Sequence, residues 1–160
     1  VALRPGVREL MGDCGRDGIP MAIVTTTSRG NAEALLRVSL GDDWSWRFAT
    51  IIDAENAPRK KPDPQAYHVA LQRLGLSPHE AVAIEDSPAG LESARAAGIP
   101  VVLARSRFFA DAPAAGAIAS GPGLDTTVGW APAPLAQRGR IDLAQIRTWH
   151  GSAIDTLRRH

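Results

Sequence analysis

The stretch AVAIEDSPAGLESARAAGIPVV, residues 81–102, constrains the fold of this chain more than any other part of it. Residues 81–84 form a short apolar run, which is typical of a strand buried on both faces. Glu85 and Asp86 then stand side by side where that strand ends. A Ser-Pro pair supplies a helix N-cap and a first-turn proline, and the helix stops at a glycine. A second strand over residues 99–103 completes a predicted β-turn-α-β unit.

The two adjacent acids have two interpretations. Open α/β sheets place their ligand sites at the carboxyl ends of the strands, and carboxylate oxygens are hard ligands suited to Mg²⁺ beside a phosphate. Alternatively, Asp86 caps the helix while Glu85 points to water, since acidic residues are common at helix starts. These residues alone support the two interpretations equally, so the choice between them depends on the rest of the sequence.

Length and composition indicate one ordinary soluble domain. A chain of 160 residues can bury a sizeable core, and 44% apolar with 22% charged residues is usual for a globular protein. The net charge of +1 and the lack of a Lys/Arg block argue against a nucleic-acid partner. No apolar run approaches the roughly 20 residues of a membrane helix, and no signal peptide opens the chain. The single cysteine, Cys14, fits a helix-face thiol in a reducing cytosol, so we expect a cytoplasmic protein.

A cluster of hydroxyl side chains, Thr25-Thr26-Thr27-Ser28, lies between a predicted strand over residues 19–24 and a predicted helix over residues 31–40. Hydroxyls and backbone N–H groups at a helix N-terminus form a ready phosphate site. Simple capping is the alternative, and it is the more usual role of a polar cluster after a strand. Upstream, residues 1–6 predict a loop, and an apolar pattern at helical spacing follows from residue 7 until the glycines at 15 and 18.

The segment Arg59-Lys60-Lys61-Pro62-Asp63-Pro64 is a second candidate phosphate contact. It follows a short strand predicted over residues 49–52 and precedes a helix over residues 65–74. Its prolines hold the lysines extended, and a lysine in a stiff loop near a sheet edge can clamp a phosphate. Plain surface charge is the alternative for an exposed lysine pair. The side chains expected to pack in this region are Trp44, Trp46, Tyr67, Ala70, Leu71 and Leu74.

The C-terminal part completes a single domain. We expect a last short strand over residues 117–120, a Gly/Pro-rich linker over residues 121–134, and an amphipathic helix over residues 141–159 that Gly151 weakens. No repeat or second domain is evident. The alternation of strands and helices predicts a three-layer α/β/α fold with a parallel sheet and right-handed crossovers.

Three signals thus fall at strand ends in chain order: the hydroxyl of Thr25, the ammonium of Lys61 and the acids Glu85 and Asp86. This arrangement resembles the haloacid dehalogenase (HAD)-like phosphohydrolases. AIVTTTS resembles their second motif, KKPDP their third, and AIEDSPAGLESARAAGIP their fourth, which is the most specific. Within the superfamily, the TTTS cluster, the lysine pair and the WHG near the C-terminus are most similar to the CbbY-type sugar-bisphosphate phosphatases. The similarity runs from about Leu3 to the C-terminal helix and implies a Rossmann-like core.

One departure from the family dominates. Its first motif, Asp-x-Asp-Gly-Thr, and the helical cap that normally follows it are absent from this sequence. Residues 1–6 resemble the point where the family chain returns from cap to core, so we expect residues 1–160 to be a single, partial core domain. In the family, the strand that carries the first motif lies in the middle of the sheet, between the strands that lead to Thr25 and Glu85. We expect its absence to leave a groove of unpaired backbone groups.

The resemblance also implies roles. In the family, an aspartate attacks a phosphomonoester, and water hydrolyses the aspartyl-phosphate. By resemblance, Thr25 donates its hydroxyl to the phosphate, and the backbone N–H of Thr26 lies beside it. Lys61 balances the charge between nucleophile and phosphate, while Glu85 and Asp86 hold Mg²⁺ directly or through water. The other lysine of the pair is less suitable, because the family's lysine immediately precedes the proline. No residue of the sequence can be assigned as the nucleophile.

The implied function is that of a Mg²⁺-dependent phosphatase acting on a small phosphorylated sugar, with a pentulose bisphosphate as the nearest resemblance. We expect the chain to be inactive by itself and its partner to be a missing N-terminal segment, with no nucleic acid or membrane involved. A sugar phosphomutase is the neighbouring enzyme. A non-catalytic remnant or interaction module of the same fold is the alternative from another class. An upstream reading frame with Asp-x-Asp-Gly-Thr would distinguish them.

Overall fold

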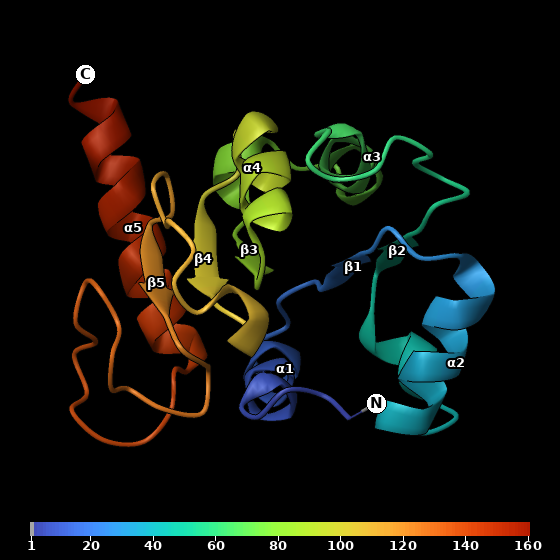
Figure 1. Cartoon of the computed structure of the whole chain (residues 1–160), viewed down its shortest axis with the longest axis horizontal. Coiled ribbons are helices and arrows are strands. Elements are labelled where there is room, and N and C mark those ends of the chain that lie inside the picture. The colour runs from blue at the N-terminus through green and yellow to red at the C-terminus, as the bar shows by residue number, and fades with distance from the viewer. Residues whose placement is uncertain (1) are drawn as a thin grey trace.

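The computed structural model describes residues 2–160, and residue 1 of the predicted opening loop lies outside the described residues. Strands and α-helices alternate along the chain up to β4, which is followed by β5 without an α-helix between them, as Figure 1 shows. The strands are β1 (Ala22–Val24), β2 (Thr50–Ile52), β3 (Ala83–Glu85), β4 (Val101–Ala104) and β5 (Ala119–Gly121). The helices are α1 (Val7–Arg16), α2 (Arg29–Leu40), α3 (Gln65–Leu74), α4 (Pro88–Ala96) and α5 (Leu143–Arg158), with short 3₁₀ turns at Trp44–Arg47, Pro78–Glu80 and Arg107–Phe109.

The predicted elements are present, with differences at their ends. α3 has the predicted bounds. α5 continues through Gly151, and no atom lies within 4 Å of the place where a Cβ at this residue would be. β3 begins later than predicted and includes Glu85, so the first of the two acids belongs to the strand itself. The expectation for the tryptophans is half wrong. Trp44 packs against α2 at 6% exposure, whereas Trp46 is 91% exposed because the 3₁₀ turn directs the two rings apart.

Two layers of helices cover the strands. α3 and α4 pack on one face, where they bury Val101 and Leu103 of β4. α1 and α5 pack on the other face, against Val102 and Ala104. Alternate residues of β4 therefore contact opposite helix layers, as expected for a parallel strand that is buried on both faces. The predicted three-layer α/β/α architecture is confirmed.

The strands form two parallel sheets rather than one. β1 pairs with β2, and β3, β4 and β5 pair in that order, whereas no ladder joins β1 to β3 within residues 2–160. The residues at this break are less buried than those of β4. All three residues of β1 are half-buried, and Ile84 at the centre of β3 is 38% exposed. This break agrees with the predicted groove between the strands that lead to Thr25 and Glu85.

Helix α3 spans the break from one side. It packs against β1 and β2, and it also contacts α4, which lies over β3 and β4. Val24 of β1 and Tyr67 of α3 lie in the same part of this layer, because Val24 packs against the apolar cluster to which Tyr67 belongs. The side chains of α3 therefore reach both sheets.

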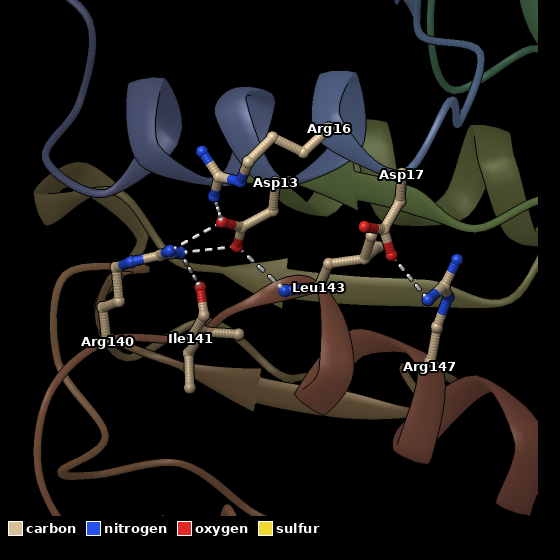
Figure 2. Close-up of polar contacts among 7 residues, drawn as sticks. All are labelled: Asp13, Arg16, Asp17, Arg140, Ile141, Leu143 and Arg147. Carbon is tan, nitrogen blue, oxygen red and sulfur yellow. Dashed lines mark hydrogen bonds and ion pairs between the residues drawn. The ribbon is translucent and has the colours of Figure 1, made fainter.

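The C-terminal segment is tied back to α1 through Asp13 (Figure 2). The Asp13 carboxylate accepts hydrogen bonds from the Arg140 guanidinium at 2.7 and 2.8 Å and from the backbone N–H of Leu143 at 3.1 Å. The hydrogen bonds from Arg140 outweigh the effect of burial and hold the pKa of Asp13 below its ordinary value. The segment that follows the predicted linker is thus fixed to α1 where α5 begins. Within residues 2–160 no helix combines the length and apolar character that crossing a membrane requires.

Candidate active site

Glu85, the last residue of β3, is the centre of the candidate site. Its side chain is only 8% exposed, and burial of a carboxylate is costly unless donors satisfy it. One oxygen, Oε1, accepts hydrogen bonds from both the Lys61 ammonium and the Tyr67 hydroxyl. The two donors come from different parts of the chain, the loop after β2 and the first turn of α3. β3 therefore ends in a carboxylate that is held from two sides.

Lys61 connects the ends of the two sheets. Besides Glu85, its ammonium donates to the backbone carbonyl of Val24 at 3.1 Å, the residue that precedes Thr25. The Lys61 side chain is 14% exposed, whereas Lys60 lies on the surface. The two lysines therefore differ in the structure: Lys61 contacts Glu85, and Lys60 faces solvent. The prolines of the loop keep Lys61 outside a helix, so its long side chain can reach back across the break.

The second oxygen of Glu85 lies against α4. A Cβ built on Gly90 would come within 1.9 Å of Oε2, so the glycine makes the room that the carboxylate occupies. No hydrogen bond or ion pair within residues 2–160 uses Oε2, and none of the fully enclosed polar side-chain atoms of these residues lacks a partner. Oε2 is therefore not fully enclosed. One oxygen of Glu85 is fixed, and the other retains access to solvent.

Asp86 is more open than Glu85 and lies beside Arg4. Its side chain is 49% exposed, and one carboxylate oxygen is 4.0 Å from the Arg4 guanidinium. Arg4 in turn donates to the backbone carbonyls of Ala104, Arg105 and Pro122, which follow or end β4 and β5. A single arginine from the opening loop thus joins Asp86 to the carboxyl ends of two further strands.

The hydroxyl loop is ordered by local hydrogen bonds. Thr25 Oγ1 accepts from the backbone N–H of Thr27 at 3.2 Å, and Ser28 caps α2 by accepting from the N–H of Asn31. Among residues 2–160 no hydrogen bond or ion pair joins Thr25 or Thr26 to Lys61, Glu85 or Asp86. The capping interpretation therefore describes Ser28, whereas both Thr25 and Thr26 remain half-buried beside the carboxyl end of β1.

The buried carboxylate of Asp53, paired with the partly exposed Arg29, fixes the same loop. Asp53, just after β2, is fully buried, and its carboxylate lies 3.0 Å from the Arg29 guanidinium. It also accepts from the backbone N–H groups of Glu55 and Asn56, which form a tight turn. In that turn the N–H of Ala54 donates to the Thr27 carbonyl at 2.9 Å. The turn after β2 therefore fixes the loop after β1.

A small cavity lies next to the two acids. Its volume is about 170 Å³, and its lining residues are Arg4, Pro5, Val7, Ile84, Glu85, Asp86, Ala104 and Leu124. Thr25 and Lys61 do not line it. The structure therefore brings Lys61 and Glu85 into contact and places the cavity at Glu85 and Asp86, but it does not gather all the predicted residues around one cavity.

The carboxylates of the site are ligands of the kind that a divalent cation takes. Mg²⁺ prefers about six oxygen ligands in octahedral geometry, and proteins usually supply only one or two carboxylates. Oε2 of Glu85 and the carboxylate of Asp86 are available oxygens at one sheet edge. Within residues 2–160, however, no group of three or more His, Cys, Asp and Glu side chains lies close enough to hold a metal ion. The donor set fits Mg²⁺ in kind and is incomplete in number.

A family model described as haloacid dehalogenase-like hydrolase matches residues 1–98, which include the hydroxyl loop, the lysine loop and both acids. The chain belongs to the haloacid dehalogenase-like hydrolases. The predicted family is thereby confirmed, and so is its CbbY-type character. The protein CbbY encoded on a plasmid of Cupriavidus necator is 45% identical over 154 residues, which cover 95% of this chain and 61% of that protein. CbbY from Rhodobacter capsulatus is 44% identical over 108 residues, covering 68% of this chain and 48% of the relative.

Solved structures of this family have the same core. A crystal structure of CbbY from Rhodobacter sphaeroides in complex with xylulose-(1,5)bisphosphate superposes with a TM-score of 0.69 at 39% identity. The match covers 72% of this chain and 52% of that one. β-Phosphoglucomutase from Clostridium difficile superposes with a TM-score of 0.70 over 95% of this chain and 58% of its own. At 19% identity it is evidence for the fold alone. The chain spans roughly half to three-fifths of the length of these HAD-like relatives.

The sequence analysis missed several residues that shape this HAD-like site. Tyr67 was predicted only as a buried residue of its helix, and the pattern gave no sign that its hydroxyl reaches Glu85. Arg4 and the Asp53–Arg29 pair carried no signal either. Their contacts join elements far apart in the chain, so a local pattern cannot reveal them. A glycine in the first turn of a helix directly after two acids was the one available hint for Gly90.

Proposed function

We propose that this chain is the phosphate- and cation-binding part of a Mg²⁺-dependent phosphatase that acts on a phosphorylated sugar. The observation that carries the proposal is the Lys61 ammonium, which bonds both the Val24 carbonyl at the end of β1 and the Glu85 carboxylate at the end of β3. A cation fixed between two strand ends, beside an open carboxylate, suits a phosphate and a metal ion in adjacent positions. A pentulose bisphosphate is the proposed substrate class, because a CbbY relative was solved with xylulose-(1,5)bisphosphate.

The proposed roles follow from how each residue is held. Thr25 offers its hydroxyl and Thr26 its backbone N–H to the phosphate, and Lys61 balances negative charge between phosphate and nucleophile. Asp86 and Oε2 of Glu85 would hold Mg²⁺, with water and further ligands completing the shell. When bound, Mg²⁺ would neutralise the charge on the phosphate oxygens. The chain's own residues align the phosphate, and alignment with charge neutralisation is most of what phosphoryl transfer asks of a protein.

We further propose that the nucleophile is an aspartate on a segment outside residues 1–160. The support is the break between β1 and β3. Both strands offer an unpaired edge there, and their apolar residues are more exposed than those of β4. A single extended strand could pair with both edges and place its carboxyl end beside Lys61. On this proposal residues 1–160 form one partial core domain, and the chain alone does not turn over substrate, since covalent catalysis needs its nucleophile.

The packing of the C-terminal segment supports the single-domain part of the proposal. α5 shares an apolar cluster with α1 and β4, so residues 121–160 do not form a unit of their own. A reducing, cytoplasmic location remains part of the proposal and is supported by the single free thiol of Cys14.

The test is phosphate binding by the 160-residue chain. We would measure inorganic phosphate and Mg²⁺ binding by NMR chemical-shift changes in the intact chain and in Lys61→Ala and Asp86→Asn variants. Lys61→Ala should lose most phosphate affinity, and Asp86→Asn most of the Mg²⁺ dependence. Lys60→Ala is the matched control. The Lys60 side chain lies on the surface, so its removal should change neither the phosphate affinity nor the Mg²⁺ binding. Equal behaviour of the two lysine variants would contradict the proposal and favour a non-catalytic module.

A further inference from the structure

We propose that Tyr67 is a positioning residue of this site: its hydroxyl fixes one oxygen of Glu85 so that the other faces the cation. The inference rests on the proposed function. It adds a role for Tyr67, which is not among the residues proposed to bind the phosphate or the metal ion. The Tyr67 hydroxyl bonds neither Thr25 nor Thr26 nor the open oxygen of Glu85. It acts through the oxygen that Lys61 shares.

The position of Tyr67 leaves its hydroxyl one role. The side chain is 6% exposed and lies in the third position of α3, with its ring in the apolar cluster beneath β3 and β4. Within residues 2–160 the hydroxyl bonds to Glu85. An ionised carboxylate only accepts hydrogen bonds, so the Tyr67 hydroxyl is the donor in this contact, and the packing of its ring fixes the direction of that bond.

The carboxylate needs such a donor to hold its orientation. The terminal torsion of a glutamate is broad and roughly two-fold, so one hydrogen bond leaves either oxygen free to take the inward place. Lys61 alone is also a weak orienting group, because its ammonium is a compact charge on a flexible stem. Tyr67 donates to the same oxygen from a rigid ring on a helix. Two donors from separate elements, with Gly90 giving room to Oε2, select one rotamer.

Tyr67 also restrains the lysine. The Lys61 ammonium lies 5.3 Å from the centre of the Tyr67 ring, a cation–π distance. The ring therefore holds the ammonium while the hydroxyl holds the carboxylate. This separation lets the two contributions be tested independently, because Tyr67→Phe removes the hydroxyl and keeps the ring.

The experiment measures Mg²⁺ binding by the 160-residue chain and its Tyr67→Phe variant. Residues that orient a metal ligand typically change metal affinity by about tenfold or more when removed, so we expect the Mg²⁺ dissociation constant to rise about tenfold. Affinity for inorganic phosphate without Mg²⁺ should change much less, since the ring still supports Lys61. Thr148→Val is the matched control: it removes a hydroxyl that donates to the Ala144 carbonyl within α5, far from the site in the chain.

A spectroscopic readout separates positioning from mere packing. Tyr67 is the single tyrosine of the chain, so protein made with ¹³Cζ-labelled tyrosine gives one tyrosine signal. Addition of Mg²⁺ should shift that signal in the intact chain and leave it unmoved in Asp86→Asn. A purely structural tyrosine would show no response to Mg²⁺.

The outcomes distinguish this inference from the proposed function. Mg²⁺ and phosphate binding that depend on Asp86 and Lys61, with a Tyr67→Phe variant equal to the intact chain and a silent tyrosine signal, would overturn the inference and leave the function standing. Binding that ignores Lys61 and Asp86 would reject the proposed function, and the positioning role with it. A Tyr67→Phe loss confined to Mg²⁺, accompanied by a Mg²⁺-responsive tyrosine signal, supports both.

Discussion

At the scale of single residues, the site depends on which atoms of Glu85 remain free. Lys61 and Tyr67 occupy one oxygen, and Gly90 leaves space for the other. Sequence reasoning identified Glu85 and Lys61, because adjacent acids at a strand end and a lysine before proline are local patterns. It could not identify Tyr67 as their neighbour, since that contact depends on how α3 packs across the sheets. For Gly90 the sequence offered only a glycine in the first turn of the helix that follows the acids. The motifs predict which groups take part, and the packing decides how each one is held.

Gly90→Ala tests that packing. An alanine in a helix is intrinsically more favourable than glycine by about 1 kcal/mol, so without a clash the variant would gain stability. Here the added Cβ meets Oε2 of Glu85 at 1.9 Å, and we expect a net loss of about 1–3 kcal/mol in the free energy of unfolding. Urea denaturation measures it. Gly151→Ala in α5 is the control, because nothing lies within 4 Å of its added Cβ, and it should gain up to about 1 kcal/mol. A gain in both variants would contradict the observed position of Glu85.

At the scale of elements, the contact between α1 and the start of α5 is the main polar tie across one helix layer. The sequence predicted both helices from their apolar spacing. It did not predict that Asp13 and Arg140, which are 127 positions apart, form a paired contact, because charge pairing between distant helices leaves no periodic signal. A second, exposed pair of Asp17 and Arg147 lies nearby at 2.9 Å, as Figure 2 shows.

Asp13→Asn should weaken this tie in a pH-dependent way. Because hydrogen bonds to charged groups contribute about 1.5–3 kcal/mol, we expect a loss of that order at pH 7. The pKa of Asp13 in the folded protein lies below its unfolded value of about 3.9. The stabilisation by the Asp13 carboxylate is therefore fully present above that pH and is lost as the pH falls through the folded pKa. Thermal unfolding from pH 7 to pH 3 should therefore show the two proteins converging below about pH 4.

Asp17→Asn is the control for that series. The side chains of Asp17 and its partner Arg147 are each about half exposed. Exposed ion pairs contribute roughly 0–1 kcal/mol to the free energy of unfolding. We expect little change at any pH. A difference between the intact chain and Asp13→Asn that stays constant down to pH 3 would contradict the prediction, because it would mean that folding does not lower the pKa of Asp13.

At the scale of the whole molecule, the chain keeps both helix layers but divides its strands between two sheets. The parallel α/β fold could be predicted from the alternation of apolar runs and capped helices. The break could be predicted only from the family resemblance, since nothing in the local pattern of residues 22–24 or 83–85 says which strand lies beside them. α3 holds the two parts together from one side, and Lys61 links the strand ends.

The last prediction concerns that break. We expect the 160-residue chain alone to show no phosphatase activity, because on our proposal none of residues 2–160 is placed to attack a phosphate held beside Lys61. Lys61 and Tyr67 hold one oxygen of Glu85, and on this proposal the other oxygen and Asp86 would be bound to the metal ion, so neither carboxylate is free to act as nucleophile. A separately produced segment that contains a strand ending in Asp-x-Asp-Gly-Thr should restore Mg²⁺-dependent release of phosphate from a pentulose bisphosphate.

Phosphate release is the measurement, and each component has its control. Restored turnover should be lost when the first aspartate of the added segment is changed to asparagine, which retains the strand and removes the nucleophile. It should also be lost with Lys61→Ala in the chain and kept with Lys60→Ala, because only Lys61 reaches across the break. Amide exchange should slow in β1 and β3 when the segment binds, since an inserted strand would pair with both unpaired edges. Turnover by the chain without the segment, or restoration without protection of both strands, would contradict this account, because the catalytic carboxylate and the missing strand are proposed to arrive together.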